Sequence, residues 1–252
     1  MSGEFEHQVA EGANLPFSGW DFSPIATRWR LRSPPWDFAA LLRERMRHAS
    51  SMVDLGTGGG EFLASLAPLP RTTFATEGHP PNVSVAQGRL APLGVRVLPI
   101  GTDLHIDLPD GTIDLVADRH EAFAASEVLR ILRPRGWFIT QQVGPRNNVE
   151  LLQKFGAPPI HPTNNVSGVD GLADEIAAAG FAIHDQDEAM YTDEFLDIGA
   201  VVFYLRAIPW EVPGFSLDRH RESLREIYHE IERTGSFRVT SHRLLVVAQR
   251  PE

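Results

Sequence analysis

The 252-residue sequence contains no cysteine, which excludes disulfides, thiolate metal ligands and cysteine nucleophiles. It also lacks an apolar run long enough to cross a bilayer, and residues 1–6 lack the basic and then apolar pattern of a secretory signal. These absences favour a reducing compartment. The sequence therefore predicts a cytoplasmic globular protein without membrane contact.

Basic residues are also fewer than acidic ones. The chain has 23 Lys and Arg against 33 Asp and Glu, a formal net charge of -10. Nucleic-acid affinity rests largely on clustered Lys and Arg, so this balance argues against a nucleic-acid partner. Two local basic runs, 28–32 and 43–47, remain, and we interpret the second as the solvated face of a helix predicted over residues 36–48.

Metal-binding patterns are missing as well. The ten histidines include no HExxH motif, and His220 and His229 do not fall on one helix face at ligand spacing. The sequence predicts no metal site.

Residues 53–61, Val-Asp-Leu-Gly-Thr-Gly-Gly-Gly-Glu, are the most informative segment that is present. An apolar run, a glycine turn and a following helical pattern predict a strand whose turn brings backbone N–H groups against a nucleotide-like ligand. The dinucleotide pattern G-x-G-x-x-G fails here, because Glu61 stands where its last glycine is required. The spacing therefore argues against a nicotinamide-dependent dehydrogenase.

Three further signals follow the turn in the order expected of a doubly wound fold. Residues 72–77 form a β-prone run ending in Glu77, 21 residues after the first glycine of the turn, where such a fold has the carboxyl end of its second strand. Residues 95–103 and 108–116 predict the third and fourth strands, and residues 128–139 a helix end, a Pro/Gly turn and a fifth strand. A carboxylate at Glu77 can accept hydrogen bonds from both ribose hydroxyls, so Glu77 is the predicted ribose contact.

Over residues 51–142 these signals resemble the class I S-adenosylmethionine (SAM)-dependent methyltransferases, a Rossmann-like superfamily. The pattern D-x-G-x-G-x-G from Asp54 to Gly60 resembles their motif I, and residues 132–136 are similar to their L-x-P-G-G passage, with Arg135 where glycine is usual. Residues 195–210 and 240–243 look like a bacterial methyltransferase-domain subfamily of unassigned substrate.

The resemblance implies SAM as cofactor and S-adenosylhomocysteine as product. Counting back from Asp114, the family's adenine-contacting Asp falls on Thr102, so this contact is left open between Thr102 and Asp103. The cofactor-binding residues implied in total are Asp54, Gly56, Thr57, Gly58, Gly60, Glu77, Gly78, His79, Thr102, Asp103 and Leu104.

The acceptor meets the methyl group after the fourth strand in this family, where the chain has Asp118, Arg119, His120 and Glu121. His120 is the first choice for a base or substrate orienter, and Asp118 and Arg119 are the other catalytic candidates. Alternatively, Asp118 caps the next helix, Glu121 favours its N-terminus and His120 packs against the loop. The N/D-P-P-Y/F sequence is absent, which disfavours adenine amines and the glutamine amide as acceptors.

An aromatic cover over a small, ring-bearing or polar acceptor is the interpretation we favour, and its predicted substrate contacts are Trp20, Trp29, Glu121 and Trp210. These aromatics could instead simply pack the extension onto the sheet. Arg119, Arg206 and His242 could bind an anionic acceptor or pair with the abundant acids. Two other functions stay open: an RNA or protein methyltransferase, and a non-catalytic SAM-binding regulatory module. A homodimer is compatible with the sequence.

The predicted fold is α/β, a doubly wound, mostly parallel seven-stranded sheet with an antiparallel last strand. Residues 1–50 form a helical extension and substrate cover, 51–190 the SAM-binding core, 191–238 a helical cap insertion between strands six and seven, and 239–252 the final core strand. Strand six is predicted over 181–190 and the last strand over 239–248. Helices are predicted over 148–155, 170–179, 194–207 and 216–234, the last with Ser216 as N-cap and Gly235 as stop.

Overall fold

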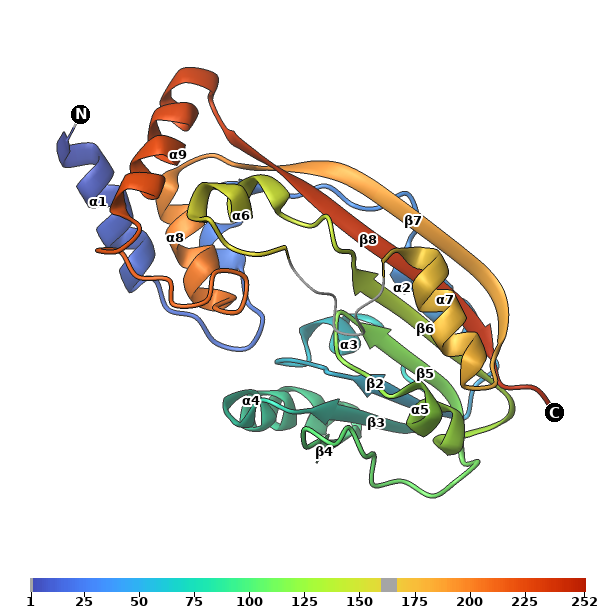
Figure 1. Cartoon of the computed structure of the whole chain (residues 1–252). Helices are drawn as coiled ribbons and strands as arrows, with labels where there is room; N and C mark the ends of the chain where they lie inside the picture. The colour runs from blue at the N-terminus through green and yellow to red at the C-terminus, as the bar shows by residue number, and fades with distance from the viewer. Residues whose placement is uncertain (1, 160–166) are drawn as a thin grey trace.

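One mixed sheet forms the centre of the protein. The computed structural model describes residues 2–159 and 167–252, and within them eight strands pair in the order β1-β7-β8-β6-β5-β2-β3-β4 (Figure 1). The strands are β1 (Trp29–Arg30), β2 (Ser51–Leu55), β3 (Thr72–Glu77), β4 (Arg96–Pro99), β5 (Ile113–Arg119), β6 (Leu132–Val143), β7 (Ala182–Phe195) and β8 (Phe237–Gln249). From β4 to β6 neighbouring strands are parallel, whereas β8 is antiparallel to both β6 and β7. The doubly wound, mostly parallel sheet with an antiparallel last strand is confirmed.

Helices cover both faces of this sheet. They are α1 (Ser2–Asn14), α2 (Phe38–Met46), α3 (Glu61–Ser65), α4 (Pro80–Leu90), α5 (Ala125–Ile131), α6 (Val149–Phe155), α7 (Val169–Ala178), α8 (Ile198–Ala207) and α9 (Arg221–Thr234), with short 3-10 turns at Ser23–Ile25 and Ala91–Leu93. Because successive side chains of a strand point to opposite faces, β5 supplies Val116 to one apolar layer and Leu115 and Ala117 to the other. The central strands are therefore buried on both sides, as parallel strands between helices are.

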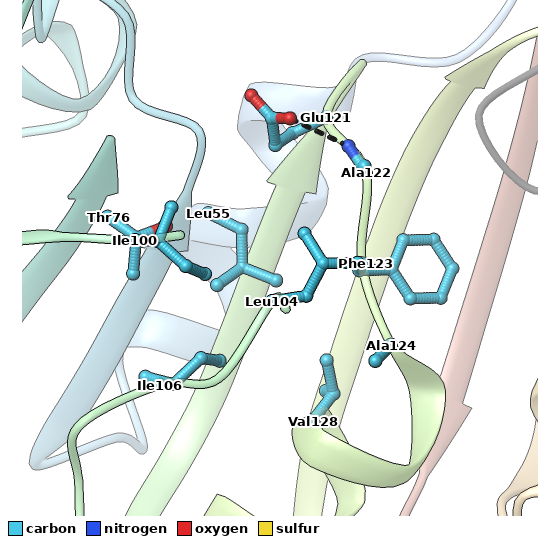
Figure 2. Close-up of a pocket in the computed structure, with 10 residues that line it drawn as sticks. All are labelled: Leu55, Thr76, Ile100, Leu104, Ile106, Glu121, Ala122, Phe123, Ala124 and Val128. Carbon is cyan, nitrogen blue, oxygen red and sulfur yellow. Dashed lines mark hydrogen bonds between the residues drawn. The ribbon is translucent and has the colours of Figure 1, made fainter. Parts of the chain in front are cut away.

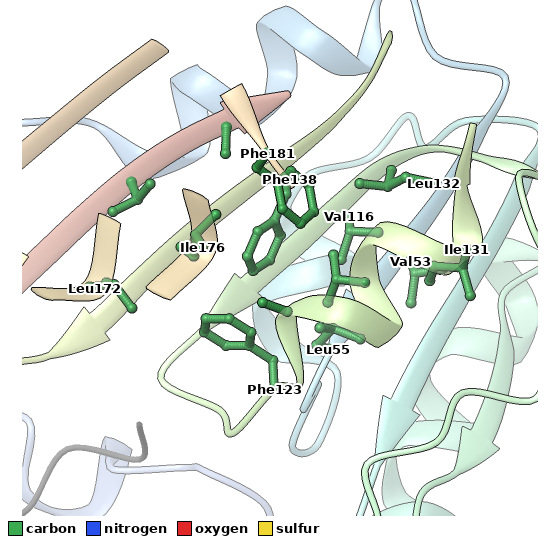
Figure 3. Close-up of a cluster of buried hydrophobic side chains, with 14 of the residues drawn as sticks. Val53, Leu55, Val116, Phe123, Ile131, Leu132, Phe138, Leu172, Ile176 and Phe181 are labelled. Atoms are coloured by element: carbon green, nitrogen blue, oxygen red, sulfur yellow. The ribbon is translucent and has the colours of Figure 1, made fainter. Parts of the chain in front are cut away.

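The layer under α5 and α7 is shown in Figure 3. Phe138 of β6 lies at its centre, edge-on to Phe123 with ring centroids 5.0 Å apart and 5.8 Å from the ring of Phe181. Leu172 and Ile176 close it from α7. The opposite layer packs α2, α3 and α4 on the other face of the same strands. The carboxyl ends of β2, β3 and β5 are thereby fixed relative to one another.

A third apolar cluster lies at the far end of β7 and β8, where α1, α8 and α9 come together (Figure 1). Asp197 caps α8 by accepting the N–H of Ala200 at 2.9 Å, and it also accepts two hydrogen bonds from Arg28 at 2.5 and 2.7 Å. Arg28 pairs with Glu11 of α1 as well. We refer to this cluster, with α1, α8 and α9, as the cap.

Two predicted helix starts in the cap are wrong. The strand predicted over 181–190 continues to Phe195, because its distal part pairs with β8 and, at Glu194 and Phe195, also with the additional strand β1. The helix predicted from residue 194 therefore begins at Ile198. The helix predicted from Ser216 begins at Arg221, since Ser216 accepts the N–H of Arg219 in a preceding turn instead of capping the helix.

The helices α2, α6 and α7, the strands β3 and β8 and the end of α9 at Gly235 lie within two residues of their predicted bounds. The third strand, predicted over 95–103, ends at Pro99, and the fourth, predicted over 108–116, is Ile113–Arg119, because Arg130 holds residues between them as a loop. The fifth strand continues beyond its predicted end at residue 139 to Val143, since it pairs with β8 up to that residue. The predicted boundaries at 190/191 and 238/239 fall inside β7 and β8, so the core and the cap share these two strands. No helix among the described residues combines the length and apolarity needed to cross a membrane.

Candidate functional site

The glycine turn joins β2 to α3 at the centre of the sheet. Gly56, Gly58 and Gly60 all have positive φ, +59°, +62° and +81°, a backbone conformation that glycine adopts without strain. Thr57 donates its N–H to the carbonyl of Thr76 at 2.9 Å, which holds the turn against β3. The turn therefore presents its backbone at the carboxyl ends of β2 and β3, where open α/β sheets bind ligands.

Two predicted substrate contacts, Trp20 and Glu121, lie directly on this turn. A Cβ atom at Gly58 would overlap Cδ1 of Trp20, and one at Gly56 would overlap the side chain of Glu121. Trp210 of the cap meets Trp20 edge-on, with ring centroids 5.7 Å apart. Three residues far apart in sequence are thus brought together over the turn.

Trp29, the fourth predicted substrate contact, lies elsewhere. Its ring stacks on Phe195 with centroids 5.3 Å and planes 3° apart, and it packs against the cap cluster. The structure therefore makes Trp29 a packing residue of the cap, because the chain turns into β1 at this point and pairs with β7.

A narrow apolar slot opens beside the turn (Figure 2). Leu55, Ile100, Leu104 and Ile106 approach it from one side, and Phe123 and Val128 from the other. Its remaining lining residues are Thr76, Glu121, Ala122 and Ala124. Its lining is mostly apolar, as in sites for flat aromatic rings, but its cavity volume of about 20 Å³ is smaller than such a ring, so binding a ring would require the slot to widen.

Of the residues predicted near adenine, the structure places only Leu104 in this slot. β4 ends at Pro99, and the chain beyond it turns outward through Thr102 and Asp103, both of which are exposed. Asp103 accepts the N–H of His105 at 3.3 Å. Thr102 and Asp103 thus lie outside the lining of the slot, whereas their neighbours Ile100 and Leu104 belong to it.

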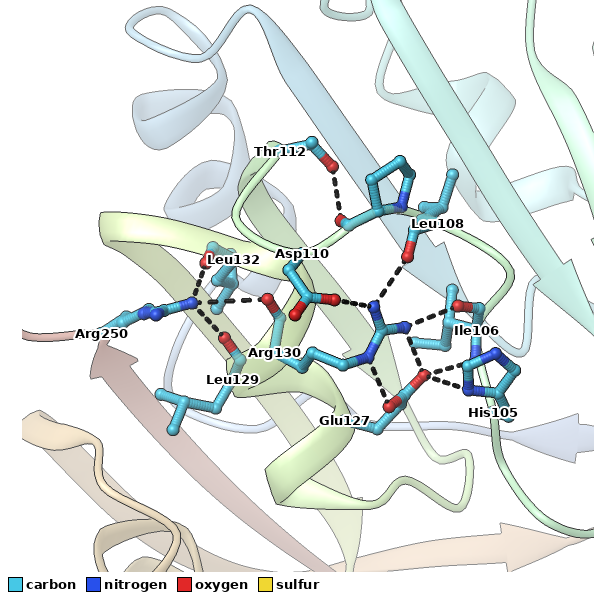
Figure 4. A network of polar contacts seen from close by, with 11 residues as sticks. His105, Ile106, Leu108, Asp110, Thr112, Glu127, Leu129, Arg130, Leu132 and Arg250 are labelled. Atoms are coloured by element: carbon cyan, nitrogen blue, oxygen red, sulfur yellow. Dashed lines mark hydrogen bonds and ion pairs between the residues drawn. The ribbon is translucent and has the colours of Figure 1, made fainter.

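Arg130 of α5 fixes the loop that lines the slot (Figure 4). Its guanidinium donates to the carbonyls of Ile106 and Leu108, both at 2.8 Å, and to the carboxylates of Glu127 and Asp110. Glu127 in turn accepts the N–H of Ile106 at 2.8 Å, and the hydrogen bond from Arg130 lowers the pKa of Glu127 to about 2. The slot is therefore held by a charge-assisted network at its outer wall.

Glu77, the predicted ribose contact, is buried at the end of β3. Its Oε1 accepts the N–H of His79 at 2.7 Å, whereas Oε2 is buried with no hydrogen-bond partner among the described residues. Leaving a carboxylate oxygen buried and unpaired costs about 1–3 kcal/mol or more. Gly78 and His79 follow it at the surface, and His79 precedes α4. This oxygen can therefore accept hydrogen bonds that the described residues do not supply.

Asp54 is buried near the turn, on the strand β2. Burial raises its pKa to about 6, an effect that the charge of Arg119 partly opposes. In the unfolded chain an aspartate loses its proton near pH 4. Between these values the folded state binds more protons than the unfolded state, so this group makes the fold less stable as the pH rises from about 4 to 6.

Asp54→Asn is therefore expected to stabilise the protein above pH 6, by up to about 3 kcal/mol. The gain should shrink as the pH falls toward 4, because Asp54 is then protonated in both states. Urea unfolding at a series of pH values measures this, with the exposed Asp218→Asn as control. A gain independent of pH would show that burial does not shift this carboxyl group.

Asp118, a predicted catalytic residue, is fully buried below the loop that follows β5. Its carboxylate accepts from Thr140 Oγ1 at 3.0 Å, Gln142 Nε2 at 2.8 Å and the N–H of Glu121 at 3.1 Å. Burial raises the pKa of Asp118 well above its ordinary value. Since these contacts engage both oxygens, the structure favours a role in positioning Glu121.

His120 and Arg119 keep exposed surface at the end of β5. His120 has φ +69° and donates its N–H to the carbonyl of Gln141 at 2.8 Å. Desolvation by the surrounding chain, then the charges of Arg243 and Arg119, lower the pKa of His120 well below its ordinary value. A neutral ring next to two guanidinium groups is thus available beside the turn.

The sequence did not predict most residues of the slot, among them Thr76, Ile100, Ile106, Phe123 and Val128. It also did not predict the surroundings of His120, which are Gln141, its partner Trp36, and Arg243. The alternation Leu104-x-Ile106-x-Leu108 between two predicted strands is a signal for a buried loop wall. Nothing in the sequence links Trp36 to Gln141, because that contact depends on how α2 lies on the sheet.

Comparison with known proteins agrees with this geometry. Residues 53–140 match the family model described as methyltransferase domain, Methyltransf_11. The chain is 29% identical over 129 residues to the methyltransferase tpcM of Aspergillus fumigatus, a match that covers 47% of this chain and 40% of that protein. The chain thus spans less than half the length of this curated relative.

Among solved structures, the fold is similar to that of a Bacillus halodurans protein assigned to the methyltransferases, with TM-score 0.61, 17% identity and coverage of 86% of this chain and 99% of that one. The [4+2]-cyclase SpnF matches with TM-score 0.54 and 15% identity over 99% and 92% of the two chains. At these identities the likeness shows the fold alone. The family model thus places a methyltransferase domain at residues 53–140, and the solved structures share the fold of most of the chain.

Proposed function

We propose that the chain is a SAM-dependent methyltransferase acting on a small-molecule acceptor. The observation that carries this proposal is the buried, unpaired Oε2 of Glu77 beside the glycine turn and the apolar slot. These features suit the parts of SAM in turn. The turn suits the amino-acid end, Glu77 the ribose hydroxyls, and the slot the adenine ring.

SAM, when bound, supplies a methyl group on a positively charged sulfur. The tasks left to the chain are to align the acceptor and to exclude water. Trp20 and Trp210 cover the turn from the extension and the cap, and Asp118 holds the loop that carries Glu121. Arg119 of β5 and Arg243 of β8 lie close enough to His120 for their charges to act on its ring, and they are our candidates for contacts to the acceptor.

We favour a small acceptor over RNA because most arginines of the two basic runs, 28–32 and 43–47, contact other groups of the protein. Arg28 and Arg30 of the first run pair with Glu11, Asp197 and Glu194. In the second run, Arg43 donates to the carbonyl of Ser65, and Arg45 lies over the ring of Trp137. These guanidinium groups are largely engaged within the protein. A cytoplasmic location and the bacterial subfamily stay predictions.

Calorimetry with SAM and S-adenosylhomocysteine tests the cofactor. We expect both to bind, and we expect binding to change the fluorescence of the protein less in Trp20→Phe than in the wild type, because Trp20 lies on Gly58. Formation of S-adenosylhomocysteine with a panel of small acceptors then tests the transfer. Absence of cofactor binding by folded protein overturns the proposal.

Two other results would favour a different function for the chain. Tight SAM binding without turnover across the panel would favour the non-catalytic module. Cofactor-stimulated binding to tRNA or rRNA at physiological salt would favour an RNA methyltransferase.

A further inference from the structure

We propose that the methyl acceptor carries an anionic group, of which a carboxylate is the type case, and that Arg119, Arg243 and His120 bind this group, with His120 donating a hydrogen bond from Nδ1. The inference rests on the proposed function and adds the class of acceptor. It also changes the role of His120, which becomes a hydrogen-bond donor and not a general base.

The strand register places these residues on one face at one end of the sheet. Arg119 of β5 lies opposite Gln141 of β6, and Val143, two residues further along β6, lies opposite Arg243 of β8. Because side chains alternate along a strand, Arg119, Gln141 and Arg243 point to the same side. They continue the apolar face under α2 and α3 at the carboxyl ends of β5 and β6. Asp118, the neighbour of Arg119, lies opposite Leu55 at the start of the glycine turn, which places Arg119 nearest to that turn.

The two guanidinium groups keep their charge free of a contacting carboxylate. The guanidinium of Arg119 lies over the ring of Phe62, 3.9 Å from its centroid, and makes no hydrogen bond or ion pair to residues 2–159 or 167–252. The carboxylates of Asp54 and Glu61 interact with the Arg119 guanidinium electrostatically, without contacting it, and Glu61 forms an ion pair with Arg89. Arg243 donates to two neutral oxygens, Asn147 Oδ1 at 2.6 Å and the carbonyl of His242 at 2.8 Å.

The other residues that the sequence offered for an anion are engaged elsewhere. Arg206 donates to the carbonyls of Gly12 and Leu15 and so fastens α1 to α8. His242 is buried, and its Nε2 lies 2.7 Å from Glu188 Oε1. Of these three candidates, Arg119 alone has a side chain without a hydrogen bond or ion pair to the described residues.

A relay of hydrogen bonds sets the tautomer of His120. Trp36 Nε1 lies 2.7 Å from Gln141 Oε1, and an indole N–H can only donate, so the amide oxygen of Gln141 must face Trp36. The amide nitrogen therefore faces His120 Nε2, at 3.0 Å, and donates to it. The proton of the neutral ring must then be on Nδ1, and the lone pair of Nε2 is occupied.

Two cations and an N–H donor recognise an oxygen anion, and they disfavour a neutral amide of the same shape. Such a site discriminates by charge, since the amide would lose the ion pairs and set its own N–H groups against donors.

The tautomer is tested first, on the protein without cofactor. Long-range proton–nitrogen NMR of protein with ¹⁵N-labelled histidine, assigned with His120→Asn, should show a protonated Nδ1 and an unprotonated Nε2. Trp36→Phe frees the Gln141 amide to rotate, and a mixture of tautomers is expected. A proton on Nε2 in the wild type overturns the role given to His120.

Anion binding is tested by NMR and calorimetry with benzoate, naphthoate and octanoate, each compared with its primary amide, on protein loaded with S-adenosylhomocysteine. We expect at least one acid to shift the His120 Nδ1 signal and to bind about 10-fold or more tightly than its amide. Arg243→Gln and, separately, Arg119→Gln should each remove about 10-fold of that affinity. Arg238→Gln is the control, because Arg238 is an exposed arginine at the start of β8, five residues before Arg243; the affinity for the acids should not change in this variant.

Equal affinity for acids and amides, or full affinity in both arginine variants, overturns the proposal. A failure of the anion site can be distinguished from a failure of the proposed function, because S-adenosylhomocysteine should bind the arginine variants as it binds the wild type. If S-adenosylhomocysteine does not bind at all, the proposed function fails, and the acids are then titrated into the free protein.

Discussion

Gly58→Val is expected to weaken the binding of SAM at least about 100-fold, the equivalent of about 2.7 kcal/mol. Gly58 has φ +62°, where a β-branched residue is strained, and any Cβ there overlaps the ring of Trp20. The valine therefore displaces Trp20 and fills the surface of the turn that the amino-acid end of SAM would approach. Calorimetry of SAM binding gives the measurement.

A matched control separates strain from contact. Gly111 has φ +63°, and nothing lies within 4 Å of a Cβ placed there. The strain of a valine at this φ should lower the free energy of unfolding by about 1–3 kcal/mol in Gly111→Val, as in Gly58→Val. The affinity of Gly111→Val for SAM should stay unchanged. If both valine variants bind SAM like the wild type, the turn has no part in cofactor binding.

Glu77→Ala is expected to weaken SAM binding by about 100-fold, and Glu77→Gln by about 10-fold, because a hydrogen bond to a charged group contributes about 1.5–3 kcal/mol. The alanine removes both oxygens, whereas the glutamine keeps one and replaces the charge. Both should affect the ligand-free protein less than the complex, since Oε2 has no partner to lose among the described residues.

The measurement is therefore a pair, the SAM dissociation constant and the free energy of unfolding without ligand. Asp103→Asn is the control, because Asp103 is exposed and outside the slot, and its affinity should stay within about twofold. Glu77 variants that lose stability without ligand but keep full SAM affinity would assign Glu77 to the fold alone.

The sequence predicted those parts of the molecule that depend on local pattern. The strand ending at Asp54 and Leu55, the glycine turn and the acid at Glu77 are all encoded within a few residues of chain. Strand order followed from the order of the signals, because a doubly wound sheet permits few alternatives. The resemblance then supplied the nature of the cofactor.

The rest depends on contacts between distant segments. Trp20 and Trp29 are similar in sequence context, yet one lies on the turn and the other in the cap, since only Trp29 enters a strand that pairs with β7. Glu194 and Phe195 read as the start of a helix, and tertiary pairing keeps them in β7. The role of His120 depends on Trp36, 84 residues earlier in the chain.

The shared strands of core and cap have a mechanical consequence. β7 and β8 pair without a gap at the cap end, up to Phe195 opposite Phe237, while Leu244 and Val246 of β8 are buried in the core. A hinge between the two halves would have to break this continuous ribbon. For the proposed cofactor, we therefore predict exchange by local displacement of the segment around Trp20, which lies on Gly58, and not by rotation of the whole cap.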